Sequence, residues 1–316
     1  MSIKKATLLL CKLSLLSIAL YGVKTFCYHC TDGFTLSGVS SNRPYIPEYD
    51  SRPLDLSEKR ELNLALSQPY QYHGCGGQSF IFFSQDQKYV IKLFKQRVFT
   101  VPLWVQYFPI PWVLNRYKEK MRWKRQDKIK RDFTSYKIAL EELQDKTGVL
   151  FVHLNKTQNL CKKLTLTDKL HIEHEVDLDQ IDFVVQKKAD LVFDYIDSLM
   201  KSGQIAEAKK SVESLVYLIV DRCMQGYHDR DPNIKTNCGF LDHKAIKIDV
   251  GKLMHSDLVK NPDVMIQEVG RITAPFLKDL QTLYPELADH LKVLLDQIKV
   301  IYAHNKEDKP CAAPRF

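Results

Sequence analysis

The sequence lacks an uninterrupted apolar run of the length that a membrane-spanning helix needs. The longest such stretch, residues 13–23, follows three lysines and is shorter than the ~20 residues required to span a bilayer. A short apolar core behind positive charges is typical of a signal peptide, but no small residues follow in the cleavage positions. We therefore expect residues 1–26 to form a retained signal-like or membrane-anchor helix. A buried N-terminal helix is the alternative, and a secreted form also fits this segment.

Paired cysteines are also scarce. The eight cysteines are scattered, and only Cys27 and Cys30 have a CxxC spacing. A structural zinc site of this kind needs a second pair, so we interpret the two as thiols beside the membrane segment, with a functional role as the alternative. The sequence also shows no module that reads nucleic-acid bases, and nucleic acid is not expected as a partner.

The positive charge is concentrated in one segment. The formal net charge is +8, and residues 116–131 hold nine Lys/Arg against two acids. An aromatic, proline-broken stretch at 101–114 leads directly into these bases. Aromatic residues beside lysine and arginine are typical of an interface with anionic lipid headgroups. We predict that residues 101–131 contact an anionic membrane surface; the alternative is a packed insertion followed by a solvated charged helix.

The remaining pattern predicts an α+β chain. Residues 27–69 are rich in Ser, Pro and Tyr without a sustained period and are predicted to be an extended linker. Strands alternate in period two and helices show apolar faces of period 3.6. The predicted strands are 79–84, 88–94, 150–154 and 181–186, and the predicted helices are 133–143, 189–200, 206–223 and two segments after residue 253.

Glycines and one lysine near the first hairpin suggest a phosphate site. Gly74, Gly76 and Gly77 lie just before the predicted strand 79–84, and glycines allow a backbone to approach phosphates closely. Lys92 lies on the second strand of the hairpin, in phase with apolar neighbours, and so faces the interior. An unpaired buried ammonium is costly, so Lys92 needs an acidic side chain or a ligand phosphate.

A second set of polar residues follows the predicted helix 206–223. Asp229 and Asp231 lie in a loop, Asn237 follows, and Asp249 ends a short apolar strand. Carboxylate and amide oxygens are ligands that suit Mg²⁺ held against phosphate oxygens. The alternative is a polar turn between two buried strands, because aspartate is common in turns.

The order of these features resembles the protein-kinase-like superfamily, especially its small atypical bacterial members, from about residue 72 to 253. The resemblance implies a two-lobed fold: a small antiparallel-sheet N-lobe at 70–188 with an insertion at 97–131, then a helical C-lobe at 189–316. It also implies ATP and Mg²⁺ as cofactors and a nucleotide as partner. By position, the three glycines match the phosphate loop, Lys92 the phosphate-binding lysine, Asp231 or Asp229 the catalytic base, and Asn237 and Asp249 the metal ligands.

The sequence also departs from the family pattern. The step from Asp231 to Asn237 is six residues, where the family has five, so either loop acid could be the base; the proline after Asp231 favours that residue. The acid that would pair with Lys92 is open among Asp132, Glu141 and Glu142. No activation segment follows Gly251, which leaves lipid, sugar or small-molecule acceptors open. The expected function is a phosphotransferase at a membrane surface. A nucleotide-binding pseudokinase and a membrane-tethered interaction protein are the alternatives.

Overall fold

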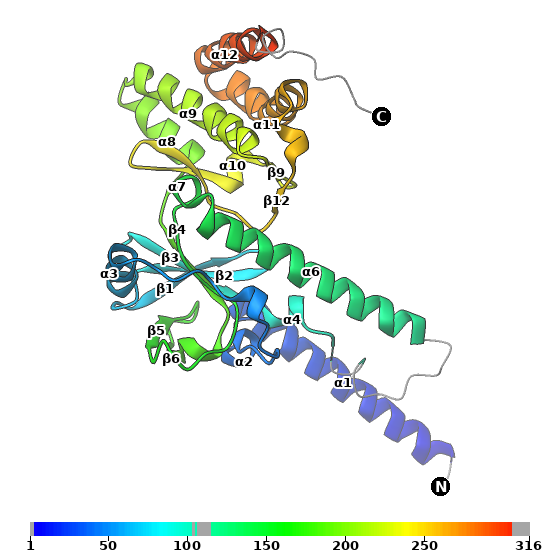
Figure 1. Cartoon of the computed structure of the whole chain (residues 1–316). Coiled ribbons are helices and arrows are strands. Elements are labelled where there is room, and N and C mark those ends of the chain that lie inside the picture. The colour runs from blue at the N-terminus through cyan, green and yellow to red at the C-terminus, as the bar shows by residue number, and fades with distance from the viewer. Residues whose placement is uncertain (1–2, 103–104, 106–114, 305–316) are drawn as a thin grey trace, which may run out of the picture.

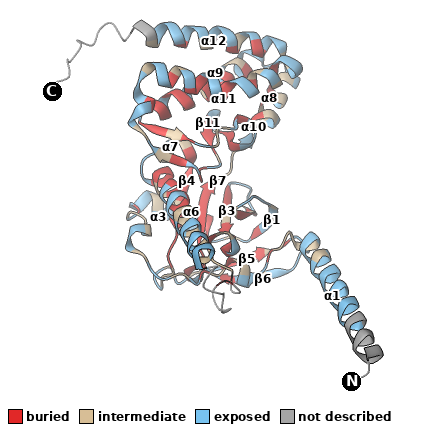
Figure 2. Ribbon diagram, turned by 90° about the vertical axis from the view of Figure 1, so that its right-hand side faces the viewer, coloured by how far each residue is buried: buried red, intermediate tan, exposed pale blue. Residues whose placement is uncertain are grey.

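The structure is a computed structural model that describes residues 3–102, 105 and 115–304. The chain has an α+β architecture. Its first two thirds build a curled sheet with a long helix across it, and its last third is mostly helical (Figure 1). Buried residues fill both the sheet and the helical layers, whereas the first helix is exposed along its described side chains (Figure 2).

The large sheet has seven strands in the order β4-β7-β3-β2-β1-β5-β6. Neighbouring strands are antiparallel except for the short parallel pair of β1 with β5. The sheet is therefore mixed and not the purely antiparallel one that the sequence predicts. Its strands are β1 (Tyr70–Cys75), β2 (Ser79–Ser84), β3 (Tyr89–Phe94), β4 (Val149–His153), β5 (Lys163–Thr167), β6 (Glu173–Asp177) and β7 (Phe183–Lys187).

Alternation along β2 and β3 gives the sheet two apolar faces. Phe82 and Ile91 are fully buried on one face, and Phe94 packs on the other with aromatic residues of helix α6 (Asn115–Glu141). Lys92 shares the phase of Phe94, as its spacing predicts. The hairpin predicted at 79–94 is confirmed, with Phe82 paired to Ile91 in antiparallel register.

The helical part has its own core, formed by the apolar faces of its four long helices. A three-stranded sheet in the order β11-β10-β8 and a strand pair, β9 with β12, lie beside it and carry the polar loop between them. The helices are α8 (Val192–Lys201), α9 (Ile205–Met224), α10 (Ile234–Asn237), α11 (Pro262–Leu283) and α12 (Pro285–His304). The strands are β8 (Asp190–Leu191), β9 (Tyr227–Asp229), β10 (Cys238–Leu241), β11 (Lys244–Lys247) and β12 (Leu253–His255).

The prediction of an extended linker at 27–69 is wrong. This segment forms α2 (Leu36–Val39), η1 (Pro47–Tyr49) and α3 (Leu56–Ala65), and its apolar side chains cover one face of the sheet. Helix α3 begins with a capping box in which Asp55 and Glu58 bond each other's backbone amides. The apolar residues of this segment are too widely spaced in the sequence to show a helical or strand period, although they pack against the sheet.

Two long helices extend from the sheet half on the same side (Figure 1). Helix α1 (Ile3–Thr31) runs beyond the predicted segment and includes the CxxC cysteines, which are free thiols. Helix α6 starts well before the helix predicted at 133–143, so the basic segment forms its first half. Short helices α4 (Gln96–Phe99) and α7 (Gln144–Thr147) flank it, and the predicted aromatic stretch at 101–114 lies mostly outside the described residues. Within the described chain, no helix combines the length and apolarity needed to cross a bilayer.

Candidate functional site

A cavity of about 680 Å³ lies where the sheet meets the helical part. Its walls come from the β1–β2 turn, strands β2 and β3, the end of β7, helix α6 and the polar loop. His73, Phe83 and Val90 lie next to one another in the lining and form its apolar end, whereas Asp231 and Asp249 form its acidic end. The cavity therefore brings together segments that lie more than a hundred residues apart, among them Gly76, Gly77, Lys92, Asp231 and Asp249.

Two of the three predicted glycines line this cavity. Gly76 and Gly77 form the turn between β1 and β2, whereas Gly74 belongs to strand β1 and is not a lining residue. The Lys95 ammonium holds the turn by donating to the Gly76 carbonyl at 2.7 Å. A side chain at Gly77 would meet no protein atom within 4 Å, so the turn leaves open space beside its backbone.

The turn also contacts the segment that carries Asp249. The side-chain oxygen of Gln78 is buried without a hydrogen-bond partner among the described residues, and a Cβ at Gly251 would lie 3.3 Å from it. The same Cβ would lie 3.4 Å from the Tyr136 hydroxyl, so glycine permits this close approach. A buried acceptor without a hydrogen-bond donor costs free energy. A donor group of a ligand would supply the missing hydrogen bond to Gln78.

Lys92 lies at the floor of the cavity, on the central part of β3. Its ammonium donates to the backbone carbonyl of Ile248, next to Asp249. Burial lowers the pKa of Lys92, the nearby Asp249 carboxylate opposes this shift, and the Lys247 ammonium adds to it. A lysine held in this way by one carbonyl gains from an anionic ligand, because a phosphate would restore the charged form.

None of the three acids proposed as partners of Lys92 contacts it. Asp132 pairs with Lys128 at 2.6 Å, Glu142 accepts from the Tyr227 hydroxyl, and Glu141 pairs with Lys137 at 3.7 Å. The residue of α6 that does line the cavity is Tyr136. Burial raises the pKa of Tyr136 well above its usual range, so its hydroxyl stays protonated as a donor.

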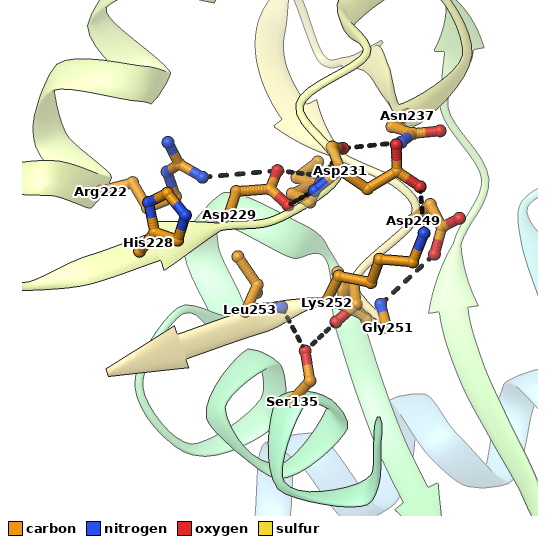
Figure 3. Close-up of polar contacts among 12 residues, drawn as sticks. Ser135, Arg222, His228, Asp229, Asp231, Asn237, Asp249, Gly251, Lys252 and Leu253 are labelled. Atoms are coloured by element: carbon orange, nitrogen blue, oxygen red, sulfur yellow. Dashed lines mark hydrogen bonds and ion pairs between the residues drawn. The ribbon is translucent and has the colours of Figure 1, made fainter. Parts of the chain in front are cut away.

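Asp229 is a buried structural acid. Its side chain lies 2.5 Å from the Lys247 ammonium and 3.4 Å from the Arg222 guanidinium. Arg222 in turn contacts buried Glu268, which also contacts His228. Figure 3 shows the Arg222 and His228 side chains on the opposite side of the loop from Asp249. This network anchors the loop to helices α9 and α11.

Asp231, in contrast, lines the cavity. Its carboxylate pairs with the Lys252 ammonium at 2.7 Å, and both side chains are about half exposed. This hydrogen bond with Lys252 is the main cause that lowers the pKa of Asp231. The preference for Asp231 over Asp229 as the candidate base remains a prediction, and the geometry supports it because only Asp231 faces the open space.

Asn237 and Asp249 meet beside Asp231 (Figure 3). The amides of Ile248 and Asp249 both donate to the Asn237 backbone carbonyl, at 2.8 and 3.3 Å, which fixes the two residues next to each other. The Asn237 side-chain amide donates to the Asp231 carbonyl at 2.8 Å and leaves its oxygen bonded to the Thr236 hydroxyl. No group of three metal-binding side chains occurs among the described residues. One carboxylate and one amide suit Mg²⁺ only together with ligand oxygens, as in a nucleotide complex.

Several other lining residues are not among those predicted from the sequence. At the apolar end, the His73 ring stacks on Phe83 at 3.8 Å, with the Lys188 ammonium over the same ring. Burial and the charge of Lys188 lower the pKa of His73, so its ring is more readily neutral. Val90 belongs to the same wall. The alternation of β2 and β3 could have placed Phe83 and Val90 there, since both share the phase of the Lys92 face.

Comparisons with known proteins complete the description. No protein-family model and no curated protein matches the sequence. Among solved structures, the bifunctional kinase-methyltransferase WbdD matches with a TM-score of 0.33 and 14% identity over 79% of this chain. A co-crystal structure of WbdD with the kinase inhibitor LY294002 matches with a TM-score of 0.30 and 16% identity. The chain spans about half of that protein, 48% of its length. TM-scores and identities this low carry no argument about function. Any assignment of function therefore rests on the residues of the chain itself.

Proposed function

We propose that the chain is a kinase-like phosphotransferase that uses ATP and Mg²⁺ to phosphorylate a hydroxyl group. The observation that carries the proposal is the cavity in which Gly77, Lys92, Asp231 and Asp249 meet. They come from the β1–β2 turn, β3, the loop after β9 and the segment after β11. A glycine turn, a buried lysine and two acids in one cavity are the parts that phosphoryl transfer needs for positioning and charge neutralisation.

Different parts of the cavity suit different parts of a nucleotide. Its apolar end, with Phe83, Val90 and His73, suits a planar base, whose burial needs hydrophobic contact and few polar groups. The open backbone of Gly77 and the Lys92 ammonium suit the phosphates. Mg²⁺, when bound, would neutralise phosphate charge, with Asp249 and Asn237 as its protein ligands. Asp231 would orient the acceptor hydroxyl and accept its proton.

Isothermal titration calorimetry with ATP and Mg²⁺ tests the binding step. The wild-type chain should bind ATP in the presence of Mg²⁺, and Asp249→Ala should lose the Mg²⁺-dependent part of the affinity. Asp194→Ala is a matched control, because Asp194 is an exposed acid at the rim of the same cavity. If Asp249→Ala binds ATP with the same Mg²⁺ dependence as the wild type, Asp249 is not a ligand of the metal.

Turnover separates the enzyme from a pseudokinase. Release of ADP with candidate lipid, sugar and small-molecule acceptors should be abolished by Asp231→Asn, while ATP binding is retained. Tight ATP binding by the wild-type chain without transfer to any acceptor would favour a nucleotide-binding module. No binding at all would favour an interaction protein.

We also propose that this phosphotransferase works at an anionic membrane surface. Helix α1 exposes large apolar side chains around its circumference, including Leu16, Leu20 and Phe26 at 57%, 61% and 69%. The first half of α6 extends on the same side and carries the basic cluster, with Trp123 63% exposed (Figure 1). An exposed apolar helix and a cationic helix that extend from the same half of the molecule complement a surface of acyl chains and negative headgroups.

Vesicle co-sedimentation tests this association. Four of the exposed basic residues of α6 can be changed to glutamine together: Lys120, Arg122, Lys124 and Lys130. Each base near the surface contributes about 1 kcal/mol, so the loss should approach 1000-fold on vesicles rich in phosphatidylserine. The control changes four exposed lysines of the helical part: Lys244, Lys278, Lys292 and Lys299. Equal loss in the two variants would show that only net charge matters.

A further inference from the structure

Four lysines line the cavity, and Lys252 is the one at its acidic end. The Lys188 ammonium lies over an aromatic ring of the apolar end, 4.9 Å from the ring centre. Lys187 pairs with Glu61 at 2.8 Å. Lys92 reaches from the sheet to a backbone carbonyl at the cavity floor. Only Lys252 therefore stands beside the candidate base among the described lining residues.

The backbone of Lys252 is held firmly, whereas its side chain is only loosely held. The Ser135 hydroxyl of α6 donates to the Val250 carbonyl and accepts from the Leu253 amide at 2.6 Å, so both sides of Lys252 are fixed (Figure 3). The side chain, 48% exposed, pairs with Asp231 at 2.7 Å. An ion pair with this exposure contributes about 0–1 kcal/mol, so the ammonium can exchange partners at little cost.

We propose that Lys252 is a catalytic residue that binds the phosphoryl group while it passes from ATP to the acceptor. This inference rests on the proposed function. In the step, the acceptor oxygen forms a bond to the γ-phosphorus and the bond from that phosphorus to the bridging oxygen breaks. ADP leaves with the electron pair, and the hydroxyl proton goes to Asp231. Lys252 stays protonated and gains or loses no covalent bond.

The charges around the transferred group explain why a cation is needed there. The group carries negative oxygens and must pass between the carboxylates of Asp231 and Asp249, which would repel it. The Lys92 ammonium is held by the Ile248 carbonyl and has no contact with Asp231. Lys252 already contacts Asp231 and can turn towards a phosphoryl oxygen beside it. A cationic donor that reaches the developing charge contributes a factor of about 100 to transfer.

A transition-state analogue tests the proposal without knowledge of the acceptor. Calorimetry would compare binding of ADP·Mg²⁺ with and without fluoroaluminate, which occupies the place of the transferred group. Fluoroaluminate should tighten ADP binding to the wild-type chain. Lys252→Met should lose about 100-fold of that tightening while its affinity for ADP·Mg²⁺ alone stays within about twofold. Lys252→Arg, which keeps the positive charge, should restore most of the effect.

The matched control is Lys292→Met on helix α12. Lys292 is also 48% exposed and pairs with Asp289 at 2.8 Å, but far from the cavity, and this variant should tighten as the wild type does. Equal tightening by Lys252→Met overturns the proposal, as does loss of plain ADP·Mg²⁺ binding in that variant. A wild-type chain that binds ADP·Mg²⁺ without any tightening also overturns it and leaves the nucleotide site standing. A wild-type chain that binds no nucleotide instead overturns the proposed function itself.

Discussion

Replacing Asp229 and Asp231 separately should separate stability from catalysis. Asp229 is 3% exposed and neutralises Lys247 at 2.5 Å and Arg222 at 3.4 Å. Asp229→Ala would leave two buried cations without this carboxylate, and breaking a buried ion pair in this way costs about 3–5 kcal/mol. Arg222 keeps Glu268, so the Lys247 ammonium suffers most. For a chain of this size, the melting temperature should fall by roughly 6–10 °C.

Asp231→Ala provides the matched comparison two residues away. Its ion pair with Lys252 is about half exposed, so its removal should cost less than about 1 kcal/mol, or about 2 °C. Differential scanning calorimetry of the two variants measures the difference directly. An Asp229→Ala protein that melts within 2 °C of the wild type would contradict this assignment of Asp229 to stability and Asp231 to catalysis. An Asp231→Ala protein that is destabilised as strongly as Asp229→Ala would contradict it equally.

Three further predictions follow from the site and the sheet. Lys92→Met should abolish ATP binding in calorimetry and leave the melting temperature equal or higher, because a buried ammonium with a lowered pKa is removed. Phe83→Ala should weaken ATP binding about tenfold without changing inorganic tripolyphosphate binding, because only the base would contact that ring. The guanidinium of Arg52 lowers the pKa of Glu58 to about 2. A lowered pKa stabilises the fold above the unfolded value near 4.5, so denaturant titration should show about 1 kcal/mol lost between pH 4.5 and 2, and Glu58→Gln should remove this part.

The sequence indicates those parts of the site that depend on local pattern. Alternation in 79–94 is enough to place Lys92 on the inner face, because side chains on a strand point to opposite sides in turn. The spacing of Asn237 and Asp249 around a short hairpin likewise brings them together through backbone bonds of neighbouring residues. These expectations need no knowledge of distant segments.

The remaining features depend on contacts between distant segments. Asp229 and Asp231 look alike in sequence, and they differ because helix α9 and strand β11 supply Arg222 and Lys247 as ion-pair partners for the carboxylate of Asp229 alone. Tyr136 lines the cavity because of the place where α6 crosses the sheet. The periodicity of the α6 sequence does not determine that place. The same holds for residues 32–69, whose apolar side chains are too sparse for a pattern but cover a whole face of the sheet.

A crystal structure with a non-hydrolysable ATP analogue and Mn²⁺ would show directly whether the cavity holds a nucleotide and a metal ion. The anomalous signal of Mn²⁺ locates the metal independently of the nucleotide. The expected result is the base against Phe83, the phosphates between the Gly77 backbone and the Lys92 ammonium, and the metal on Asp249 and Asn237. Nucleotide bound outside this cavity, or a metal that touches neither Asp249 nor Asn237, would contradict it.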